Sequence, residues 1–267
     1  MVALAIIWMS AERAFAESVL LPDFTDSVAG REDVTFADLV RLVVPGTAGN
    51  ETIDVRDIGG EAVEDLEPES TASLRVTAVP VRSGGLGRMA LLLDFGRGRD
   101  VVGLAILALF DVADKPRLLD AANVATGNET SFLDPVRLAV GSGDDLLAIR
   151  STHANSSQNY TTAALVLVRN DRLELVDMIF VFGERACAYE RTQQLDLKQG
   201  AGEPFSDIVA TVTDLTTPSG QDCDEAAPPG PGTRTITVTY HWGSAEQRYI
   251  PDSDAFDVLA RENEERF

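Results

Sequence analysis

The sequence predicts a mainly β protein: an antiparallel sandwich, a barrel-like sheet or a propeller-like meander, with a short N-terminal helix and a C-terminal helix. Short apolar or alternating runs follow one another between residues 74 and 242, and tight turns separate them. Strands joined by turns without intervening helices favour antiparallel pairing. In the last run, Thr233 to Trp242, threonines alternate with apolar residues, which indicates one wet face and one buried face.

The individual strands are placed by their apolar runs. The hairpin around Asn170-Asp171 is the plainest, because this pair joins two apolar runs directly. Ranges 104–110 and 163–168 are apolar at consecutive positions, so both faces of those strands should be covered. We expect strands over 74–78, 89–95, 101–110, 117–124, 136–140, 146–151, 162–168, 173–182, 189–197, 208–215 and 233–242.

A helix is expected near each end of the chain. Thr35 and Asp38 resemble a capping box in which Asp replaces Glu, and Pro45 should end the helix that follows. A second start signal lies at residues 251–254. The apolar residues at helical spacing are Phe36, Leu39, Val40 and Val43 in the first helix, and Phe256, Leu259 and Ala260 in the second.

The chain divides into three predicted parts. Residues 1–16 form a signal peptide, residues 17–70 a polar and acidic segment with one short helix, and residues 71–267 the main antiparallel β domain ending in a helix. Within the second part, residues 46–70 are rich in Gly, Asp and Glu and suggest an exposed connector.

The signal peptide is inferred from two features. Val2 to Met9 is an apolar run too short to span a bilayer, and Ala14-Phe15-Ala16 fits a signal peptidase site. The alternative is a buried N-terminal strand or helix. No other stretch reaches the ~20 apolar residues of a membrane span. We therefore expect a periplasmic or secreted protein with no membrane span in the mature chain.

The net charge of −21 limits the possible partners. Nucleic acid phosphates and anionic membrane surfaces both need Lys and Arg, so neither partner is expected. The charge is typical of a soluble surface. A cationic partner or bound calcium is the alternative.

Two cysteines, Cys187 and Cys223, make up the whole cysteine content. An even count in an exported chain favours one disulfide, which would tie the polar loop around Cys223 to the sheet. Two free thiols are the alternative. Neither cysteine lies in a C-x-x-C pair or a Cys/His cluster, so a zinc or redox site is not indicated.

No motif specifies a cofactor or a metal, and we expect none. Asp94-Phe95-Gly96 matches a kinase tripeptide in letters only. Asp94 and Asp100 flank a turn that is similar to a calcium loop, but Arg97 and Arg99 in the same turn would repel a cation. Two histidines in the chain cannot build a multi-histidine metal site.

One segment, Arg150 to Thr162, is dense in hydrogen-bonding side chains and holds one of the two histidines. It predicts a recognition surface for a polar ligand. The alternatives are a long hairpin whose polar groups satisfy their own backbone, or a hydrolytic site using Ser151 and His153. The candidate ligand-binding residues are His153, Asn155, Gln158, Asn159 and Tyr160.

Together these features predict an exported soluble envelope protein that binds a small polar ligand or another envelope protein without catalysis. The alternative is a periplasmic hydrolase using His153 with a nearby carboxylate. A structural or accessory subunit without a ligand is the third possibility.

Overall fold

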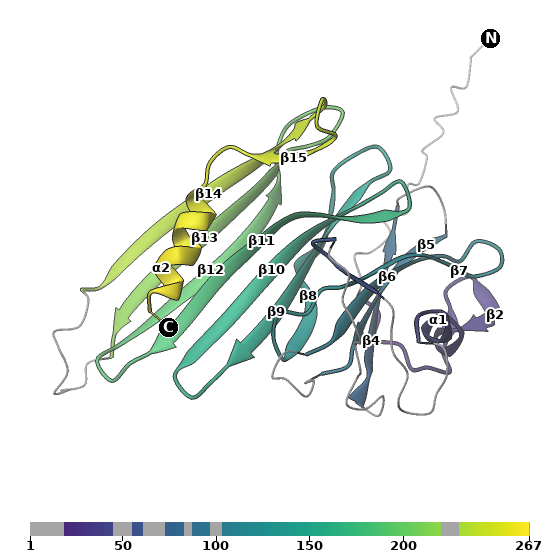
Figure 1. Ribbon diagram of the computed structural model, residues 1–267, viewed down its shortest axis with the longest axis horizontal. Coiled ribbons are helices and arrows are strands. Elements are labelled where there is room, and N and C mark those ends of the chain that lie inside the picture. The colour runs from purple at the N-terminus through teal and green to yellow at the C-terminus, as the bar shows by residue number, and fades with distance from the viewer. Residues whose placement is uncertain are drawn as a thin grey trace, which may run out of the picture.

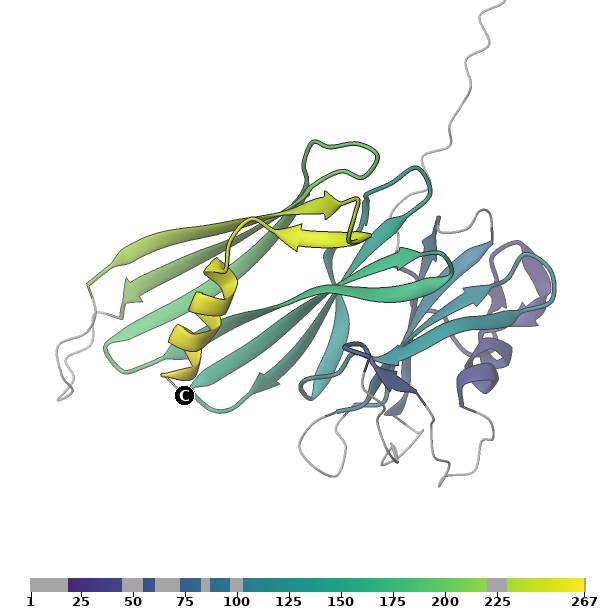
Figure 2. The same cartoon turned by 45° about the horizontal axis from the view of Figure 1, so that its top comes forward.

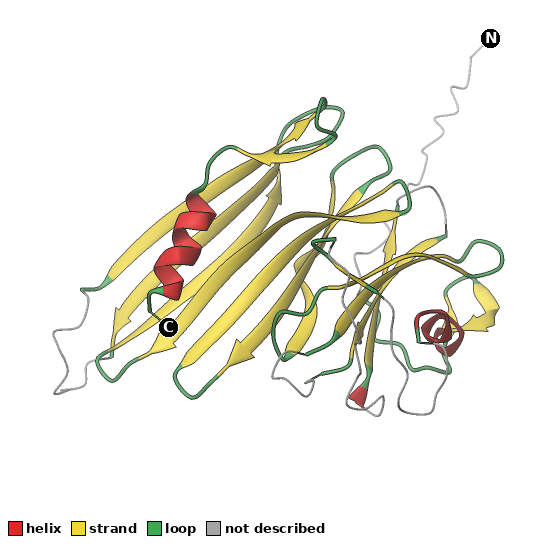
Figure 3. Ribbon diagram, in the orientation of Figure 1, coloured by secondary structure: helices red, strands yellow, loops and turns green. Residues whose placement is uncertain are grey.

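The computed structural model describes residues 19–44, 55–60, 73–82, 87–96, 103–219 and 230–266. Strands dominate, with a short helix near each end, which confirms the predicted mainly β class (Figure 3). The elements are β1 (Ser27–Val28), β2 (Arg31–Thr35), α1 (Phe36–Val43), β3 (Arg56–Asp57), β4 (Arg75–Val81), β5 (Arg88–Asp94), β6 (Ala105–Asp111), β7 (Arg117–Asn123), β8 (Glu129–Ala139), β9 (Asp145–Ala154), β10 (Gln158–Arg169), β11 (Arg172–Arg185), β12 (Tyr189–Gln199), β13 (Ile208–Pro218), β14 (Gly232–Gly243), β15 (Arg248–Pro251) and α2 (Ala255–Glu264).

The described strands form three sheets. A small sheet has the order β3-β7-β6-β5-β4, a large one runs in chain order from β8 to β15, and β1 and β2 form a hairpin. β3 runs parallel to β7, and every other pair is antiparallel. Neither of the two larger sheets closes on itself, so the fold is a stack of open sheets rather than a barrel.

The large sheet splits into two layers between β11 and β12. These strands pair only over Gly183–Arg185 and Glu190–Thr192, whereas β10 and β11 pair along their whole length. Beyond the short junction the strands diverge, and one apolar cluster fills the space between β8–β11 and β12–β15. Figures 1 and 2 show the resulting order of layers, from α1 through the small sheet and β8–β11 to β12–β15.

Helix α1 covers the outer face of the small sheet. Thr35 accepts a hydrogen bond from the Asp38 backbone and Asp38 accepts one from the Thr35 backbone, which confirms the predicted capping box. These bonds and the Arg41 guanidinium hold the pKa of Asp38 below its usual value. Phe36, Leu39 and Val43 are buried against the sheet, as the helical spacing predicts.

The small sheet packs its other face on β8–β11. Leu92, Leu107 and Leu109 meet Ile149 and Val166 in a continuous apolar cluster. We call this side of β9–β11 the front face, and the side that meets β12–β15 the back face. Because side chains alternate along a strand, every second residue from Ile149 or Ala164 lies on the front face.

Arginine–aspartate pairs join the small and large sheets around this cluster. The Asp145 carboxylate, which is fully buried, accepts hydrogen bonds from the Arg82 backbone (2.7 Å), Nε (3.0 Å) and Nη2 (2.9 Å). Arg88 bonds Asp171, and Arg56 bonds both Asp120 and the Leu173 carbonyl. These contacts fix the two sheets relative to each other at points far apart in the sequence.

Polar side chains fill the gap where β11 leaves β12. The Gln193 side chain accepts a hydrogen bond from the Phe182 backbone (2.9 Å), and its amide donates to Asn263 of α2 (2.9 Å). Gln193 and Asn263 are buried. They therefore occupy positions that a neighbouring strand would otherwise fill, and they anchor α2 over the junction.

A buried ion pair lies next to this junction. Arg191 on β12 binds Asp214 on β13 through Nε (2.7 Å) and Nη2, and both side chains are at most 10% exposed. Arg234 on β14 lies 3.5 Å from Asp214 and also pairs with Glu262 of α2. Thus α2 is held to the sheet by charge as well as by Phe256 and Leu259.

The structure corrects two predictions from the sequence. Strands β9 and β10 run through the polar segment, leaving only Asn155 to Ser157 as a turn. Val55 and Ile58 are buried beside β3, inside a range interpreted as an exposed connector. The predicted start signal at residues 251–254 is confirmed, since α2 begins at Ala255 with Asp254 as its N-cap. Residues 1–16 and most of 46–70 lie outside the described residues.

Candidate functional site

The candidate site begins with a buried serine that fixes a loop. Ser151 on β9 is 3% exposed, and its hydroxyl accepts hydrogen bonds from the backbone of Thr126 (3.0 Å) and Gly127 (2.9 Å). A Cβ on Gly127 would lie 2.6 Å from the Thr152 backbone, so the loop can approach β9 this closely only with glycine. The Ser151 hydroxyl therefore holds the loop and is not presented as a nucleophile.

The loop places Asn128 beside His153. The Asn128 amide nitrogen lies 3.0 Å from His153 Nδ1, while Asn128 Oδ1 is buried without a hydrogen-bond partner among the described residues. His153 is half-buried on the front face, two residues beyond Ser151. Its partner is thus an amide, where a hydrolase of the predicted type would hold a carboxylate.

Tyr160 lies directly across the hairpin from His153 and from Phe182 of β11. The His153 and Tyr160 rings are 6.4 Å apart, and Tyr160 stacks on Phe180 at 5.7 Å and tilts against Phe182 at 5.0 Å. Burial, together with the nearby Glu184 carboxylate, raises the pKa of Tyr160 above its usual value. Tyr160 is half-buried.

The other three candidate residues have different roles. Asn155 caps its own turn, accepting hydrogen bonds from the backbone of Ser157 (2.9 Å) and Gln158 (2.8 Å). The side-chain nitrogen of Gln158 donates a hydrogen bond to the Arg266 carbonyl (3.3 Å), and its side-chain oxygen accepts one from the Asn155 amide (3.1 Å). Asn159 is exposed and lies opposite Gly183, on the back-face side of the hairpin.

The structure thus brings together His153, Gln158 and Tyr160 on the front face. Asn155 bonds Gln158 from the turn, and only Asn159 lies on the other face. The structure also adds Phe180, which the sequence reasoning missed. The alternation Met178, Phe180, Phe182 could have shown that these aromatic residues share one face. We call the set His153, Gln158, Tyr160 and Phe180 the His153 surface.

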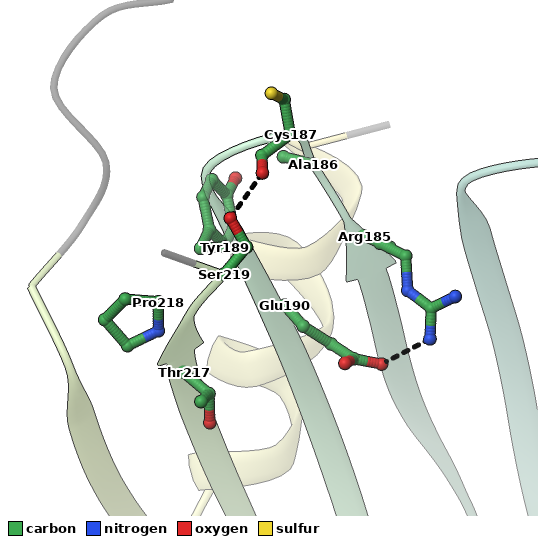
Figure 4. Close-up of a pocket in the computed structure, with 8 residues that line it drawn as sticks. All are labelled: Arg185, Ala186, Cys187, Tyr189, Glu190, Thr217, Pro218 and Ser219. Atoms are coloured by element: carbon green, nitrogen blue, oxygen red, sulfur yellow. Dashed lines mark hydrogen bonds and ion pairs between the residues drawn. The ribbon is translucent and has the colours of Figure 1, made fainter. Parts of the chain in front are cut away.

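A separate pocket of about 270 Å³ lies at the β11–β12 turn, near the end of β13 (Figure 4). Arg185 and Glu190 form an ion pair on one side, and Ser219 donates a hydrogen bond to the Cys187 carbonyl on the other. Cys223 lies outside the described residues, so the Cys187–Cys223 disulfide stays a prediction.

The fold and site define a mainly β protein of stacked open sheets with a half-exposed aromatic and polar surface at one end of its middle layer. None of the described helices has the length and apolar character needed to cross a membrane. No protein-family model, curated protein or solved structure matches the chain.

Proposed function

We propose that this protein is an exported, non-catalytic binding module that recognises a polar ligand, or a polar segment of an envelope protein, through the His153 surface. One observation carries the proposal. An imidazole and a phenol ring lie side by side on a half-exposed face, where Phe180 packs against the phenol and Asn128 bonds the imidazole. Rings that are already packed lose little conformational freedom when they bind, which favours recognition.

The chemistry of the surface points to a neutral or cationic ligand. His153 has a second ring nitrogen beyond the one beside Asn128. The Tyr160 hydroxyl donates to Gln158 (3.5 Å) and the Gln158 amide donates to the Arg266 carbonyl (3.3 Å), so a polar ligand would exchange these long bonds for its own. The net charge of −21 opposes an anionic ligand. The Ser151 and Asn128 contacts support binding over the hydrolase alternative, since they give His153 neither a nucleophile nor a carboxylate partner among the described residues.

Replacing His153 with Gln and Tyr160 with Phe together should abolish retention of the ligand while leaving the fold intact. Both changes keep most of the side-chain volume and the Tyr160–Phe180 stacking. The melting temperature should therefore change little, as is usual for partly exposed positions, which alter stability by about 0.5 kcal/mol. Immobilised protein would be incubated with envelope extract, and retained proteins and small molecules identified by mass spectrometry.

The matched control is Asn159→Ala, on the same hairpin but on the other face. It should retain the same material as the unchanged protein. Equal retention by the double variant, or equal loss in the control, would contradict recognition by the His153 surface.

We further propose that the exported form begins at Glu17 and contains a Cys187–Cys223 bond. The apolar run, the A-x-A pattern and the even cysteine count support both parts. Intact protein from the envelope, alkylated without prior reduction, should show the mass of residues 17–267 with no added label. Reduction before alkylation should add two labels. A chain that retains residues 2–16 would contradict the cleavage. A label added without prior reduction would contradict the Cys187–Cys223 bond.

A further inference from the structure

The turn that follows α2 reaches the edge of the His153 surface. The Arg266 carbonyl accepts a hydrogen bond from the Gln158 side chain (3.3 Å), and the Arg266 guanidinium donates one to the Glu184 carboxylate (2.9 Å). Figures 1 and 2 both show the end of α2 close to the turn that joins β9 to β10. A single residue therefore bonds both β10 and β11 at this surface.

Glu184 belongs to the same face of the sheet as the aromatic rings. It lies opposite Gln158, and Tyr160 lies opposite Phe182, in a stretch of the β10–β11 register without a bulge. Because side chains alternate along each strand, these four residues share one face. The pKa of Tyr160 agrees with this arrangement, since after burial the Glu184 carboxylate is the group that raises it. The carboxylate is thus a part of the His153 surface that faces the phenol.

A guanidinium group fits a carboxylate in this setting. The Glu184 side chain is 14% exposed, and it also accepts a hydrogen bond from the Tyr189 hydroxyl (3.2 Å). Arginine binds carboxylates through charge-assisted hydrogen bonds and stacks on aromatic faces. Arg266 bonds Glu184 through its guanidinium and Gln158 through its backbone carbonyl. An arginine residue of a polypeptide therefore already occupies this part of the surface.

Arg266 can leave this position without releasing α2. Its side chain is 37% exposed, and partly exposed ion pairs contribute little to stability. The helix has other anchors, because the Asn263 amide exchanges two hydrogen bonds of 2.9 Å with Gln193, and Phe256 and Leu259 are buried between the layers. Asn263 is fully buried, so only the turn beyond it has to move.

We propose that Arg266 is an internal competitor for the ligand, and that the ligand binds through an arginine residue. In the unbound protein Arg266 occupies Glu184 and Gln158. An arginine of the ligand replaces it, with the guanidinium on Glu184 and a backbone carbonyl on Gln158. This inference rests on the proposed function and names its ligand class, a peptide segment that presents an arginine.

An NMR titration with N-acetyl-L-arginine amide tests the exchange, because this probe carries a guanidinium and amide carbonyls. Arg266→Gln should lower the dissociation constant of the probe about fivefold, as expected if the internal arginine holds the site about 80% of the time. Glu184→Gln should raise that constant about tenfold or more, because the charge-assisted hydrogen bond is lost. The neutral isostere N-acetyl-L-citrulline amide should bind the unchanged protein about tenfold more weakly, or less, for the same reason.

The matched control is Arg261→Gln, which removes an equal charge from an exposed position on α2 and should leave the constant unchanged. Circular dichroism melts verify folding, and Arg266→Gln decides the outcome if Glu184→Gln does not fold. Equal constants for Arg266→Gln and Arg261→Gln would overturn the proposal. So would equal binding of the two probes, an unchanged constant in folded Glu184→Gln, or no binding by the unchanged protein and Arg266→Gln.

Retention from envelope extract separates this inference from the proposed function. If His153→Gln with Tyr160→Phe abolishes retention while neither the unchanged protein nor Arg266→Gln binds the arginine probe, the inference fails and the proposed function stands. If that double variant retains the same material while probe binding still depends on Glu184 and Arg266, the proposed function fails and the arginine site stands.

Discussion

Replacing Asp145 with Ala should lower the free energy of unfolding by about 3 kcal/mol, the lower end of the cost of breaking a buried ion pair. The Asp145 side chain is 0% exposed and accepts three hydrogen bonds from Arg82. Its loss leaves the Arg82 backbone N–H without this acceptor. It also removes the counter-charge of Arg137, whose guanidinium lies 3.6 Å from Asp145 and whose side chain is 14% exposed. Arg82 can turn to water because it is 46% exposed, which keeps the cost from being larger.

Urea denaturation at neutral pH measures this change. The matched control is Asp196→Ala, which breaks an exposed pair with Lys198 and should alter stability by about 0.5 kcal/mol or less. Equal effects of the two substitutions would show that the Arg82–Asp145 contact does not hold the small sheet against the large one.

The local features of this fold were readable from the sequence because they depend on neighbouring residues. Thr35 and Asp38 bond within one helical turn, and the alternation from Thr233 to Trp242 follows directly from the strand period. The Asn170-Asp171 turn was predicted for the same reason, and both residues adopt the positive φ angles that such a turn requires.

Features that depend on distant residues were not readable. The polar stretch from Thr152 to Thr162 resembles a loop, since long strands that extend beyond the covering sheet carry polar residues at their ends. The pairing of Asp145 with Arg82 joins residues 63 positions apart. For the candidate site, the polar hairpin was predicted from the sequence but its two faces were not, because the position of Phe180 beside Tyr160 depends on the register between β10 and β11.

The largest stability effect is expected at Asp214. Asp214→Ala should cost about 3–5 kcal/mol, because Arg191, 10% exposed, would keep a buried charge without its main partner. The double variant Arg191→Met with Asp214→Leu removes both charges and should be neutral or stabilising by about 1–4 kcal/mol. If the single and double variants lose equal stability, the loss comes from packing, and the unpaired charge is not its cause.

The pH dependence separates the ion pair from packing in the same proteins. Burial raises the pKa of Asp214, but the hydrogen bond and charge of Arg191, together with Arg234 and Gln193, outweigh it and hold the pKa below its usual value of 3.8. A group with a lowered folded-state pKa stabilises the protein above its unfolded pKa, and this contribution disappears as the pH falls through the folded-state value. Urea denaturation at pH 7 and at successive values below pH 4 should therefore show a steeper loss of stability in the unchanged protein than in the double variant. Parallel pH profiles would mean that the Arg191–Asp214 pair does not contribute to acid sensitivity.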